Sequence, residues 1–381
     1  MEFLSLKPEA FGLDISDLSL KIVKLKPWKK RTSILWPEKE KRFFELASIG
    51  EEKIKPGIVE AGEVKNEQKL AETIKEALKK VRGERLKTNY VIASLPEEKA
   101  FLQVIQMPRL PEEDLRSAVI YEAENYIPLP IEEVYLDYQI VPPVYNHLDH
   151  LDLLIAAIPK KIVDLHLSSL KLAGLFPLAF EIESQAIARA LIQREISTCP
   201  LLLIDLGATR TSFIIFSGYS LRLTSSTLIS SQTFNELIAK YLKVSLAEAE
   251  RLKIKHGLGG KKEFEFKKKT KEGKIFEALV PALVDLVQQI RRHLDYYQTH
   301  TSHEHLPPNS KAVAKILLCG GGANLKGLPE FLSMELGLSV EMGNPWVNIL
   351  PKEKMSSPSI PISESLKYTT ALGLALRGAR E

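Results

Sequence analysis

The sequence has few cysteines and no long apolar run, and each of these absences excludes a class of protein. Only Cys199 and Cys319 occur among 381 residues, far apart and without CxxC spacing, so neither a disulfide framework nor a zinc ligand set is available. We therefore expect a reducing, cytoplasmic environment. The apolar runs, such as Leu153–Ile158, are far shorter than the ~20 residues that cross a bilayer. The segment Met1–Asp14 also lacks an apolar stretch of signal-peptide length, and we expect no secretion.

The sequence also has no large excess of charge of one sign. Its formal net charge is +4, although lysine and arginine gather in Lys26–Arg42 and in Lys261–Lys274. The second cluster holds seven lysines and three glutamates, and it could attract nucleic acid or an anionic membrane through counterion release. No aromatic residue alternates with these lysines as a stacking platform for bases. We therefore interpret the cluster as a solvated surface loop and expect no nucleic-acid partner.

Two segments in different halves of the chain share one local plan. In Phe11–Leu25 and in Leu201–Phe216, an apolar strand ends in an aspartate, and a turn of small hydroxyl residues leads into a second strand. The aspartates are Asp14 and Asp205. The length allows two or more domains, and 45% hydrophobic residues is typical of a globular protein. The repeated plan predicts two hairpins in two lobes of similar topology.

Helical periodicity follows each hairpin. Apolar residues recur at helical spacing in Leu70–Val81, in Phe234–Leu242 and in a longer stretch from about Phe276 to Tyr297, where we place Pro281 near the first turn. Between the hairpins lies a block of a different kind. Its pattern predicts a small inserted α+β subdomain with one helix and four strands. The helix is Glu112–Tyr126 and the strand-like runs are Tyr90–Leu95, Ala100–Gln106, Tyr135–Val141 and Leu153–Ile158.

A third element combines a strand, a glycine run and a helix. The strand is Ile316–Cys319, three glycines and then Asn324 follow, and a helix is expected to begin near Leu328. Such a run lets the backbone approach a ligand with no side chain in the way. It is neither a Walker A loop nor a dinucleotide fingerprint, because no GK[ST] follows and the last glycine is misplaced. A plain strand-to-helix turn needs fewer glycines, so we expect a ligand here. The glycines are Gly320, Gly321 and Gly322.

The two hairpins and the glycine run together predict a nucleotide clamp. Phosphates need backbone N–H donors from a tight turn, and magnesium needs carboxylates at fixed strand ends. Either hairpin alone would be interpreted as a capped turn. Each aspartate is expected to reach Mg²⁺ through water, because this ion gives up its hydration shell reluctantly. One jaw consists of Asp14, Ser16, Ser19 and Lys21, and the other of Asp205, Gly207, Thr209 and Thr211.

Two other constellations are weaker. The segment His300–His305 holds three histidines, but proline and serine surround them and no cysteine is near, so we expect no metal site there. Glu181 and Glu183 precede the apolar helix Ala186–Leu191. Either carboxylate could orient a water or cap that helix, and capping is the favoured interpretation.

Several stretches, in their order along the chain, resemble one family. The most specific is MPRLPEEDLRSAVIYEAENYIPLPIEEVYLDYQIV from Met107, and the others are KPGIVEAGEV from Lys55, LAGLFPLAFEIESQAIARAL from Leu172, SLAEAERLK from Ser245, LLCGGGANLKGLPEFL from Leu317 and TTALGLALRG from Thr369. With these stretches the chain resembles, over nearly its whole length, the actin-like ATPase superfamily and, within it, the PilM family of type IV pilus assembly. The stretch from Met107 is similar to the inserted subdomain that this family shares with the division protein FtsA.

The resemblance implies an α/β, actin-like (ribonuclease H-like) fold of two lobes with an inserted α+β subdomain of the PilM and FtsA type. The first lobe core would comprise 1–88, 171–199 and 362–381, and the inserted subdomain 89–170. The second lobe core would comprise 200–234 and 312–361, with a subdomain at 235–311.

The resemblance also implies ATP and Mg²⁺ as cofactors, with slow ATP hydrolysis at most. Asp14 and Asp205 match the acids of the phosphate motifs and would hold the metal. Together with Glu183 in the connecting helix, they are the candidate catalytic residues. The nucleoside-facing residues would be Glu250, Lys253, Gly320, Gly321, Gly322 and Asn324.

Members of the family dock the short cytoplasmic N-terminus of the membrane protein PilN beside the inserted subdomain. The resemblance implies the same partner here, with other pilus assembly proteins of the inner membrane and the motor. The chain would then couple the inner-membrane platform to the motor from the cytoplasm, at the periphery of the inner membrane, with membrane contact only through its partner. Three alternatives stay open: an FtsA-like division filament protein, a small-molecule kinase of the superfamily, and a peptide-docking scaffold with a degenerate clamp. The ending Arg380-Glu381 lacks the amphipathic helix that FtsA carries, which favours PilM.

Two departures from the family pattern bear on the clamp. Ser16 stands where the family has glycine in the first motif, and Ser230-Ser231 stands where a Gly-Gly pair is usual. A β-carbon at either place could crowd the phosphates or demand a different turn. We expect the site to bind nucleotide and to turn it over slowly.

Overall fold

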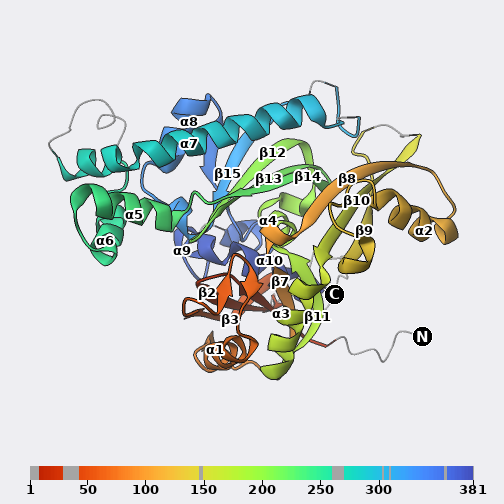
Figure 1. Ribbon diagram of the computed structural model, residues 1–381, viewed down its shortest axis with the longest axis horizontal. Helices are drawn as coiled ribbons and strands as arrows, with labels where there is room; N and C mark the ends of the chain where they lie inside the picture. The colour runs from red at the N-terminus through yellow and green to blue at the C-terminus, as the bar shows by residue number, and fades with distance from the viewer. Residues whose placement is uncertain are drawn as a thin grey trace.

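The computed structural model describes residues 8–28, 43–145, 149–259, 270–302, 304–308, 310–355 and 358–380. These residues form two lobes, above and below the centre of Figure 1, with a further subdomain to the right. Most of the two basic clusters, namely 29–42 and 261–269, lies outside the described residues. Within the described ranges, no helix combines the length and the apolar character that crossing a membrane requires.

Both lobes are built on sheets with the same strand order. In each sheet the first strand is antiparallel to the second strand on one side and parallel to a later strand on the other, and the first-lobe sheet also has Arg82–Gly83 as an extra edge strand. This arrangement confirms the two predicted hairpins and the duplicated topology. The first-lobe sheet has the order β11 (Phe176–Ile182), β7 (Tyr90–Leu95), β1 (Phe11–Ile15), β2 (Ser19–Pro27), β3 (Phe44–Lys53), β6 (Arg82–Gly83). The second-lobe sheet has the order β14 (Ser220–Thr227), β13 (Thr211–Gly218), β12 (Ser197–Leu206), β15 (Lys315–Cys319), β16 (Ser339–Met342).

Helices α4 (Glu183–Leu191) and α10 (Thr369–Arg380) lie at the centre of the molecule, between the two sheets (Figure 1). A β-carbon on Gly373 in α10 would come within 1.9 Å of the Ala186 carbonyl oxygen in α4. A β-carbon on Gly12 in β1 would come within 2.4 Å of the Ala371 carbonyl oxygen. Glycine at these two places therefore lets α10 contact both α4 and the first-lobe sheet.

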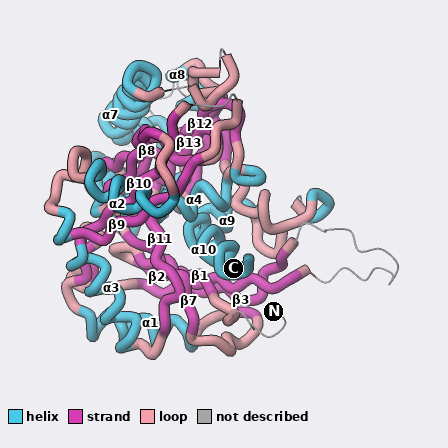
Figure 2. The backbone as a smooth tube through the Cα atoms, turned by 90° about the vertical axis from the view of Figure 1, so that its right-hand side faces the viewer, coloured by secondary structure: helices cyan, strands magenta, loops and turns pink. Residues whose placement is uncertain are grey.

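The other face of the first-lobe sheet is covered by α1 (Glu67–Lys79) and α3 (Lys160–Leu172), which lie below it and to its left in Figure 2. Leu70 and Ile74 of α1 share one buried cluster with Phe11 and Leu13 of β1. Because side chains alternate along a strand, these two residues face α1 while Gly12 between them faces α10. The short ribbon of β4 (Val59–Glu60) and β5 (Glu63–Val64) adjoins this cluster.

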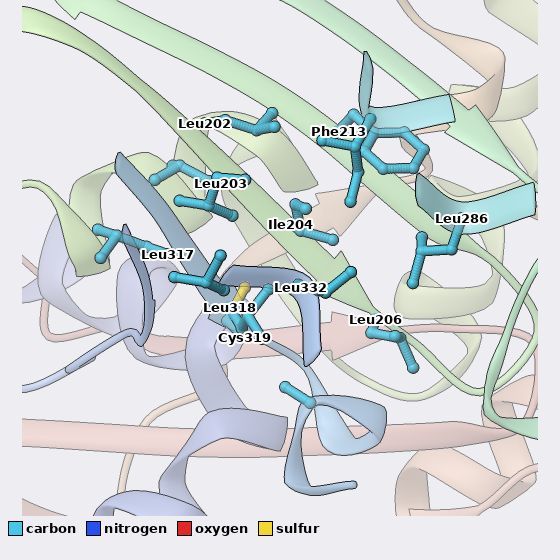
Figure 3. Packing of buried hydrophobic residues seen from close by; sticks show 14 of the residues in the cluster. Leu202, Leu203, Ile204, Leu206, Phe213, Leu286, Leu317, Leu318, Cys319 and Leu332 are labelled. Atoms are coloured by element: carbon cyan, nitrogen blue, oxygen red, sulfur yellow. The ribbon is translucent and has the colours of Figure 1, made fainter. Parts of the chain in front are cut away.

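The core of the second lobe contains side chains of β12, β15, α7 (Lys271–His300) and α8 (Leu328–Leu336), as Figure 3 shows. Helices α5 (Ser231–Leu242) and α6 (Leu246–His256) lie beside α7. The labelled residues include Ile204 of β12, Leu318 of β15, Leu286 of α7 and Leu332 of α8, and all four are fully buried. This packing gives the second aspartate turn a rigid support.

Helix α7 begins earlier than the apolar pattern predicts. The pattern placed its start near Phe276 and Pro281 near the first turn, and both predictions were wrong. The helix begins at Lys271, after Thr270 accepts a hydrogen bond from the N–H of Gly273. The polar cap sets the start, because the first turn makes few apolar contacts that the pattern could detect. Pro281 therefore lies inside the helix.

The inserted subdomain is a three-stranded antiparallel sheet in the order β8 (Phe101–Pro108), β10 (His150–Pro159), β9 (Val134–Val141). Helix α2 (Glu112–Ala123) covers one face of it through Leu115 and Val119. The other face contacts the second lobe, where Leu154 joins the buried cluster of β12 and β13. Asp152 of β10 also forms a buried ion pair with Arg222 of β14, at 2.8 Å between Oδ2 and Nη1.

One strand assigned to this subdomain from the sequence belongs elsewhere. Tyr90–Leu95 forms β7, which pairs with β1 and β11 in the first-lobe sheet. Its run is buried on both sides, as is typical of a central parallel strand, and sequence order alone cannot tell which sheet receives it. Because α3 also packs on the first lobe, we propose that the inserted subdomain extends from about Phe101 to Pro159.

Candidate nucleotide-binding cleft

The predicted motifs converge on one cleft between the lobes, with a volume of about 400 Å³. Both aspartate turns contribute, because Asp14 and Asp205 occupy matching places near the ends of β1 and β12. The glycine run after β15 closes the cleft from the second lobe. Of the residues predicted for the site, those that line the cleft are Asp14, Ser16, Ser19, Lys21, Glu183, Asp205, Gly207, Thr209, Glu250, Lys253, Gly320, Gly321, Gly322 and Asn324.

Asp14 is held in place by two neighbours. The Ser94 hydroxyl, on the adjacent strand β7, donates to its Oδ1 at 3.3 Å. Lys21 Nζ, on the partner strand β2, donates to its Oδ2 at 3.4 Å and to the Ser19 hydroxyl at 3.0 Å. Burial lowers the pKa of Lys21, but the carboxylates of Asp14, Glu51 and Asp205 together raise it by more. The pKa of this lysine therefore lies above its ordinary value. Lys21 therefore remains charged beside the aspartates.

The surroundings of Asp205 and Glu183 make the ionised form of each carboxyl group less stable. Burial, followed by repulsion from Asp14, raises the pKa of Asp205 to about 6. Burial, followed by repulsion from Asp14 and Glu98, raises the pKa of Glu183 well above its ordinary value. Such shifts occur where like charges converge, and a cation at this point would relieve them.

The two serine departures do not distort the turns. Ser16 keeps an ordinary backbone with negative φ, and its hydroxyl donates to the Ser19 carbonyl oxygen at 3.0 Å. Ser230 has an extended backbone, with φ −156°, and its side chain caps α5 by accepting from the N–H of Thr233. Neither position therefore needs the left-handed conformation that favours glycine.

The three glycines of the glycine run after β15 have different surroundings. A β-carbon on Gly320, where φ is +81°, would lie 2.2 Å from Asp205 Oδ1, and one on Gly322 would lie 1.8 Å from Leu206 Cδ2. These two glycines let the turn press against β12. A β-carbon on Gly321 would meet only Lys367 Cβ, at an ordinary 3.7 Å. Nothing in the protein requires glycine at 321, and this residue lines the cleft.

The second jaw differs from the prediction at one residue. Thr211 does not line the cleft, because its buried hydroxyl donates to the Ile229 carbonyl oxygen at 2.7 Å and fastens the segment before α5. Lys253 of α6 does reach the cleft, and its Nζ donates to the carbonyl oxygen and hydroxyl of Ser231 at 2.9 and 2.6 Å. Burial, partly offset by Glu250, lowers the pKa of Lys253 to about 8. One departure from the family pattern, Ser231, thus fixes a lysine that is expected to face the nucleoside.

A family model described as type IV pilus assembly protein PilM matches residues 12–379. This chain belongs to the PilM family. Among solved structures, one titled "PilM-PilN type IV pilus biogenesis complex" is 28% identical, covers 98% of this chain and 99% of its own, and has a TM-score of 0.74.

More distant structures show the fold alone. The ethanolamine utilization protein EutJ from Carboxydothermus hydrogenoformans is 15% identical and has a TM-score of 0.52. The match covers 97% of this chain and 89% of EutJ. MreB 5 of Spiroplasma citri bound to AMPPNP is 13% identical and has a TM-score of 0.50. The match covers 96% of this chain and 94% of MreB 5. With the PilM match, these likenesses confirm the predicted two-lobed, actin-like fold of this PilM-family chain.

The sequence interpretation missed five charged residues of this PilM-family cleft: Asp17 in the first aspartate turn and the four members of two ion pairs. Arg210 Nε lies 3.1 Å from Glu98 Oε1, and Lys367 Nζ pairs with Glu51. All four line the cleft. Arg210 follows the second aspartate turn directly and could have been noticed there. The other three stand outside every motif, and only the folded chain brings them to the cleft.

The predicted cap of α4 is also supplied by a different residue. Glu97 Oε2 accepts from the N–H of Ser184 at 3.3 Å, whereas Glu181 forms ion pairs with Arg189 and Arg377. Glu183 lines the cleft and accepts from the N–H of Glu97 at 3.4 Å. The favoured interpretation, that Glu181 or Glu183 caps α4, was wrong: Glu183 accepts from Glu97 instead, and the two arginines offer Glu181 a stronger, charged pairing.

The two described histidines of the cluster have different partners. His305 is buried and shares a hydrogen bond with the Ser217 hydroxyl at 2.9 Å between Nε2 and Oγ. His300 stacks on Tyr296, with ring centroids 4.5 Å apart. His303 lies outside the described residues.

The charge of the cleft bears on the kind of ligand that it fits. Seven acidic and four basic side chains line it, so a phosphate chain would add negative charge to an excess already present. The residues therefore fit a ligand that arrives with a divalent cation. Within the described ranges, no three His, Cys, Asp or Glu side chains gather closely enough to hold a metal by themselves. The acids are Asp14, Asp17, Glu51, Glu98, Glu183, Asp205 and Glu250, and the bases are Lys21, Arg210, Lys253 and Lys367.

Proposed function

We propose that this PilM-family chain binds Mg²⁺-ATP between its lobes and docks the cytoplasmic N-terminal segment of PilN on its inserted subdomain. It would so connect the inner-membrane assembly platform with the cytoplasmic motor of type IV pilus biogenesis. The convergence of both aspartate turns and the glycine run on one cleft carries the nucleotide half. The PilM structure that contains PilN and the MreB 5 structure bound to AMPPNP support the two halves by likeness.

In this proposal the protein contributes charge and backbone. Asp14 and Asp205 would hold Mg²⁺ through water, and the ion would supply the positive charge that the phosphates need in an acidic cleft. Lys21, already charged beside them, adds a second cation at the phosphates. The turn after Asp205 and the backbone at Gly321 face the ligand without bulky side chains.

The same site favours slow turnover. A residue that takes a proton from the attacking water must first be ionised. Burial and neighbouring carboxylates hold the pKa of Glu183 well above its ordinary value, so in the empty cleft this carboxyl keeps its proton at neutral pH more readily than a free glutamate. We therefore assign the chain a nucleotide-dependent coupling role, in which hydrolysis is at most slow.

Gly321 gives the sharpest test of nucleotide binding. The Gly321→Ala substitution is expected to leave the melting temperature nearly unchanged, because the added methyl group meets only Lys367 Cβ at an ordinary distance. It is expected to lower the affinity for a fluorescent ATP analogue at least ~10-fold, because Gly321 lines the cleft. The analogue is titrated into purified protein with Mg²⁺ and, separately, with EDTA, which is expected to abolish binding.

The neighbouring Gly322→Ala variant is the contrast. Its β-carbon meets Leu206 inside the protein, so it is expected to lower stability instead. No saturable binding by the folded parent would refute the nucleotide half and leave a peptide-docking scaffold. Equal affinity of parent and Gly321→Ala would place the ligand elsewhere.

The inserted subdomain offers a hollow of about 1010 Å³ between α2 and the edge strand β9, lined mainly by apolar side chains together with Arg116 and Asp137. Ile120 of α2 and Ile140 of β9 line it and are 38% and 49% exposed. An edge strand presents unpaired N–H and C=O groups, so an extended segment can add to β9 and place apolar side chains in the hollow. The stretch 109–137 holds eight acidic and two basic residues, which favours a segment that carries basic side chains.

Docking is tested with a synthetic peptide of the PilN cytoplasmic N-terminus. The Ile140→Asp substitution is expected to weaken its binding at least ~10-fold in calorimetric titration, because it puts a charge into the apolar hollow. Leu246→Asp on α6 is the matched control, since Leu246 is 52% exposed on the second lobe. Unchanged affinity in Ile140→Asp would exclude this hollow as the docking site.

A further inference from the structure

Arg210 and Glu98 form an ion pair across the nucleotide cleft. Arg210 stands on the turn between β12 and β13, in the second lobe. Glu98 stands in a single helical turn, Glu97–Lys99, that connects β7 of the first lobe to β8 of the inserted subdomain. Nε and Oε1 are 3.1 Å apart, and the two side chains are 18% and 11% exposed. The contact therefore joins three parts of the fold at one point inside the cleft.

The turn Glu97–Lys99 is held by further contacts from the central helix. Glu97 accepts from the N–H of Ser184 at 3.3 Å, and the N–H of Glu97 donates to Glu183 Oε2 at 3.4 Å. The polypeptide enters β8 only one residue after this turn. Any change in the partner of Glu98 therefore acts at the root of the inserted subdomain.

Arg210 has only a moderate partner in Glu98. Burial raises the pKa of Glu98 even though Arg210 opposes the shift, so the cleft disfavours this carboxylate as an anion. The other hydrogen bond of the Arg210 guanidinium is long, 3.5 Å from Nη1 to the Ser226 hydroxyl. A phosphate dianion can accept two parallel N–H bonds from a guanidinium, and it is a stronger partner than a single carboxylate oxygen.

We propose that Arg210 is the residue that distinguishes ATP from ADP, by exchanging Glu98 for the terminal phosphate when ATP enters. The inference rests on the proposed nucleotide binding. Because Arg210 follows the second aspartate turn, it lies at the phosphate end of the cleft, away from the nucleoside end expected at Glu250 and Lys253. Loss of the ion pair removes one of the contacts that hold the turn Glu97–Lys99. The presence of a terminal phosphate is thereby transmitted to the inserted subdomain, where PilN is proposed to dock.

The test compares fluorescent ATP and ADP analogues, each with Mg²⁺, on parent and variants. Glu98→Gln removes the competing charge. It is expected to raise the affinity for the ATP analogue roughly fivefold and to change the affinity for the ADP analogue less than about twofold. Arg210→Gln is expected to lower the affinity for the ATP analogue about 30-fold and the affinity for the ADP analogue less than about threefold. Glu341→Gln is the matched control, because Glu341 is paired with Lys315 at the far edge of the second-lobe sheet, and it is expected to change neither affinity.

Amide hydrogen exchange in 97–101 provides a second readout on the parent itself. ATP, but not ADP, is expected to speed exchange there, and Arg210→Gln is expected to abolish the difference between the two nucleotides. If Glu98→Gln weakens ATP instead, Glu98 orients Arg210 rather than competing for it, and the proposal is wrong. Equal losses of ATP and ADP in Arg210→Gln would also overturn it. Absence of nucleotide binding by the folded parent would overturn the proposed function together with this inference.

Discussion

Replacing Arg222 with methionine is expected to lower the free energy of unfolding by about 3–5 kcal/mol, because it leaves a buried carboxylate without its charged partner. Arg222 and Asp152 are both nearly inaccessible to solvent, with side chains 2% and 4% exposed, and their atoms are 2.8 Å apart. The neighbouring His150 Nε2 lies 3.3 Å from Asp152 Oδ1 and can compensate only in part. Urea denaturation measures the loss.

A double variant separates the charge from the packing. Arg222→Met combined with Asp152→Leu removes both charges and is expected to recover most of the lost stability, as apolar replacements of buried pairs often do. Lys315→Met is the control, because its pair with Glu341 is exposed and is worth less than about 1 kcal/mol. A loss below about 1 kcal/mol in Arg222→Met would show that solvent reaches Asp152 and that the interface is loose.

The ion pair matters for how the molecule transmits a signal. The inserted subdomain is joined to the first lobe through the chain, but Leu154 and Asp152 pack it against the second lobe. A relative movement of the lobes must therefore act on the inserted subdomain, because it is attached to both. A partner on α2 and β9 is thus placed to respond to closure of the cleft, even though neither element lines it.

The parts of the fold that the sequence predicts are those set by local chemistry. The two hairpins follow from alternation and turn residues within a few positions, and each brings its aspartate to the end of a buried strand. The glycine run after β15 is equally local. The two hairpins, taken with the glycine run, predicted one shared clamp, and the structure brings all three to one cleft because both aspartates stand at matching places in their sheets.

The parts that escaped prediction depend on residues far apart in the chain. Arg210 meets Glu98 and Lys367 meets Glu51 only after the lobes assemble, and no spacing pattern records such pairs. The place of β7 depends on which sheet accepts a parallel strand, which a buried apolar run does not specify. Thr211 has the expected residue type at the expected spacing, but a nearby carbonyl group takes its hydroxyl.

Replacing Asp205 with asparagine is expected to raise the stability of the ligand-free protein and to remove its affinity for nucleotide. Burial and Asp14 raise the pKa of Asp205 from an ordinary 3.8 to about 6. A raised carboxyl pKa makes the ionised form costly in the folded state, so the associated stability is present below pH 3.8 and is lost as pH rises through 6. The neutral amide of the Asp205→Asn variant avoids that loss, and the gain is at most about 3 kcal/mol above pH 7 and close to zero near pH 4.

Thermal unfolding from pH 4 to pH 8 tests this reasoning, with Asp114→Asn on the exposed surface of α2 as the control. The difference in melting temperature between Asp205→Asn and parent is expected to grow with pH, whereas Asp114→Asn should show no such trend. Mg²⁺ with ATP is expected to stabilise the parent and not the variant, because the carboxylate that destabilises the empty cleft is the one that the ion needs. A stability difference that does not depend on pH would mean that Asp205 is not strained by its surroundings, and that its place at the strand end reflects turn chemistry alone.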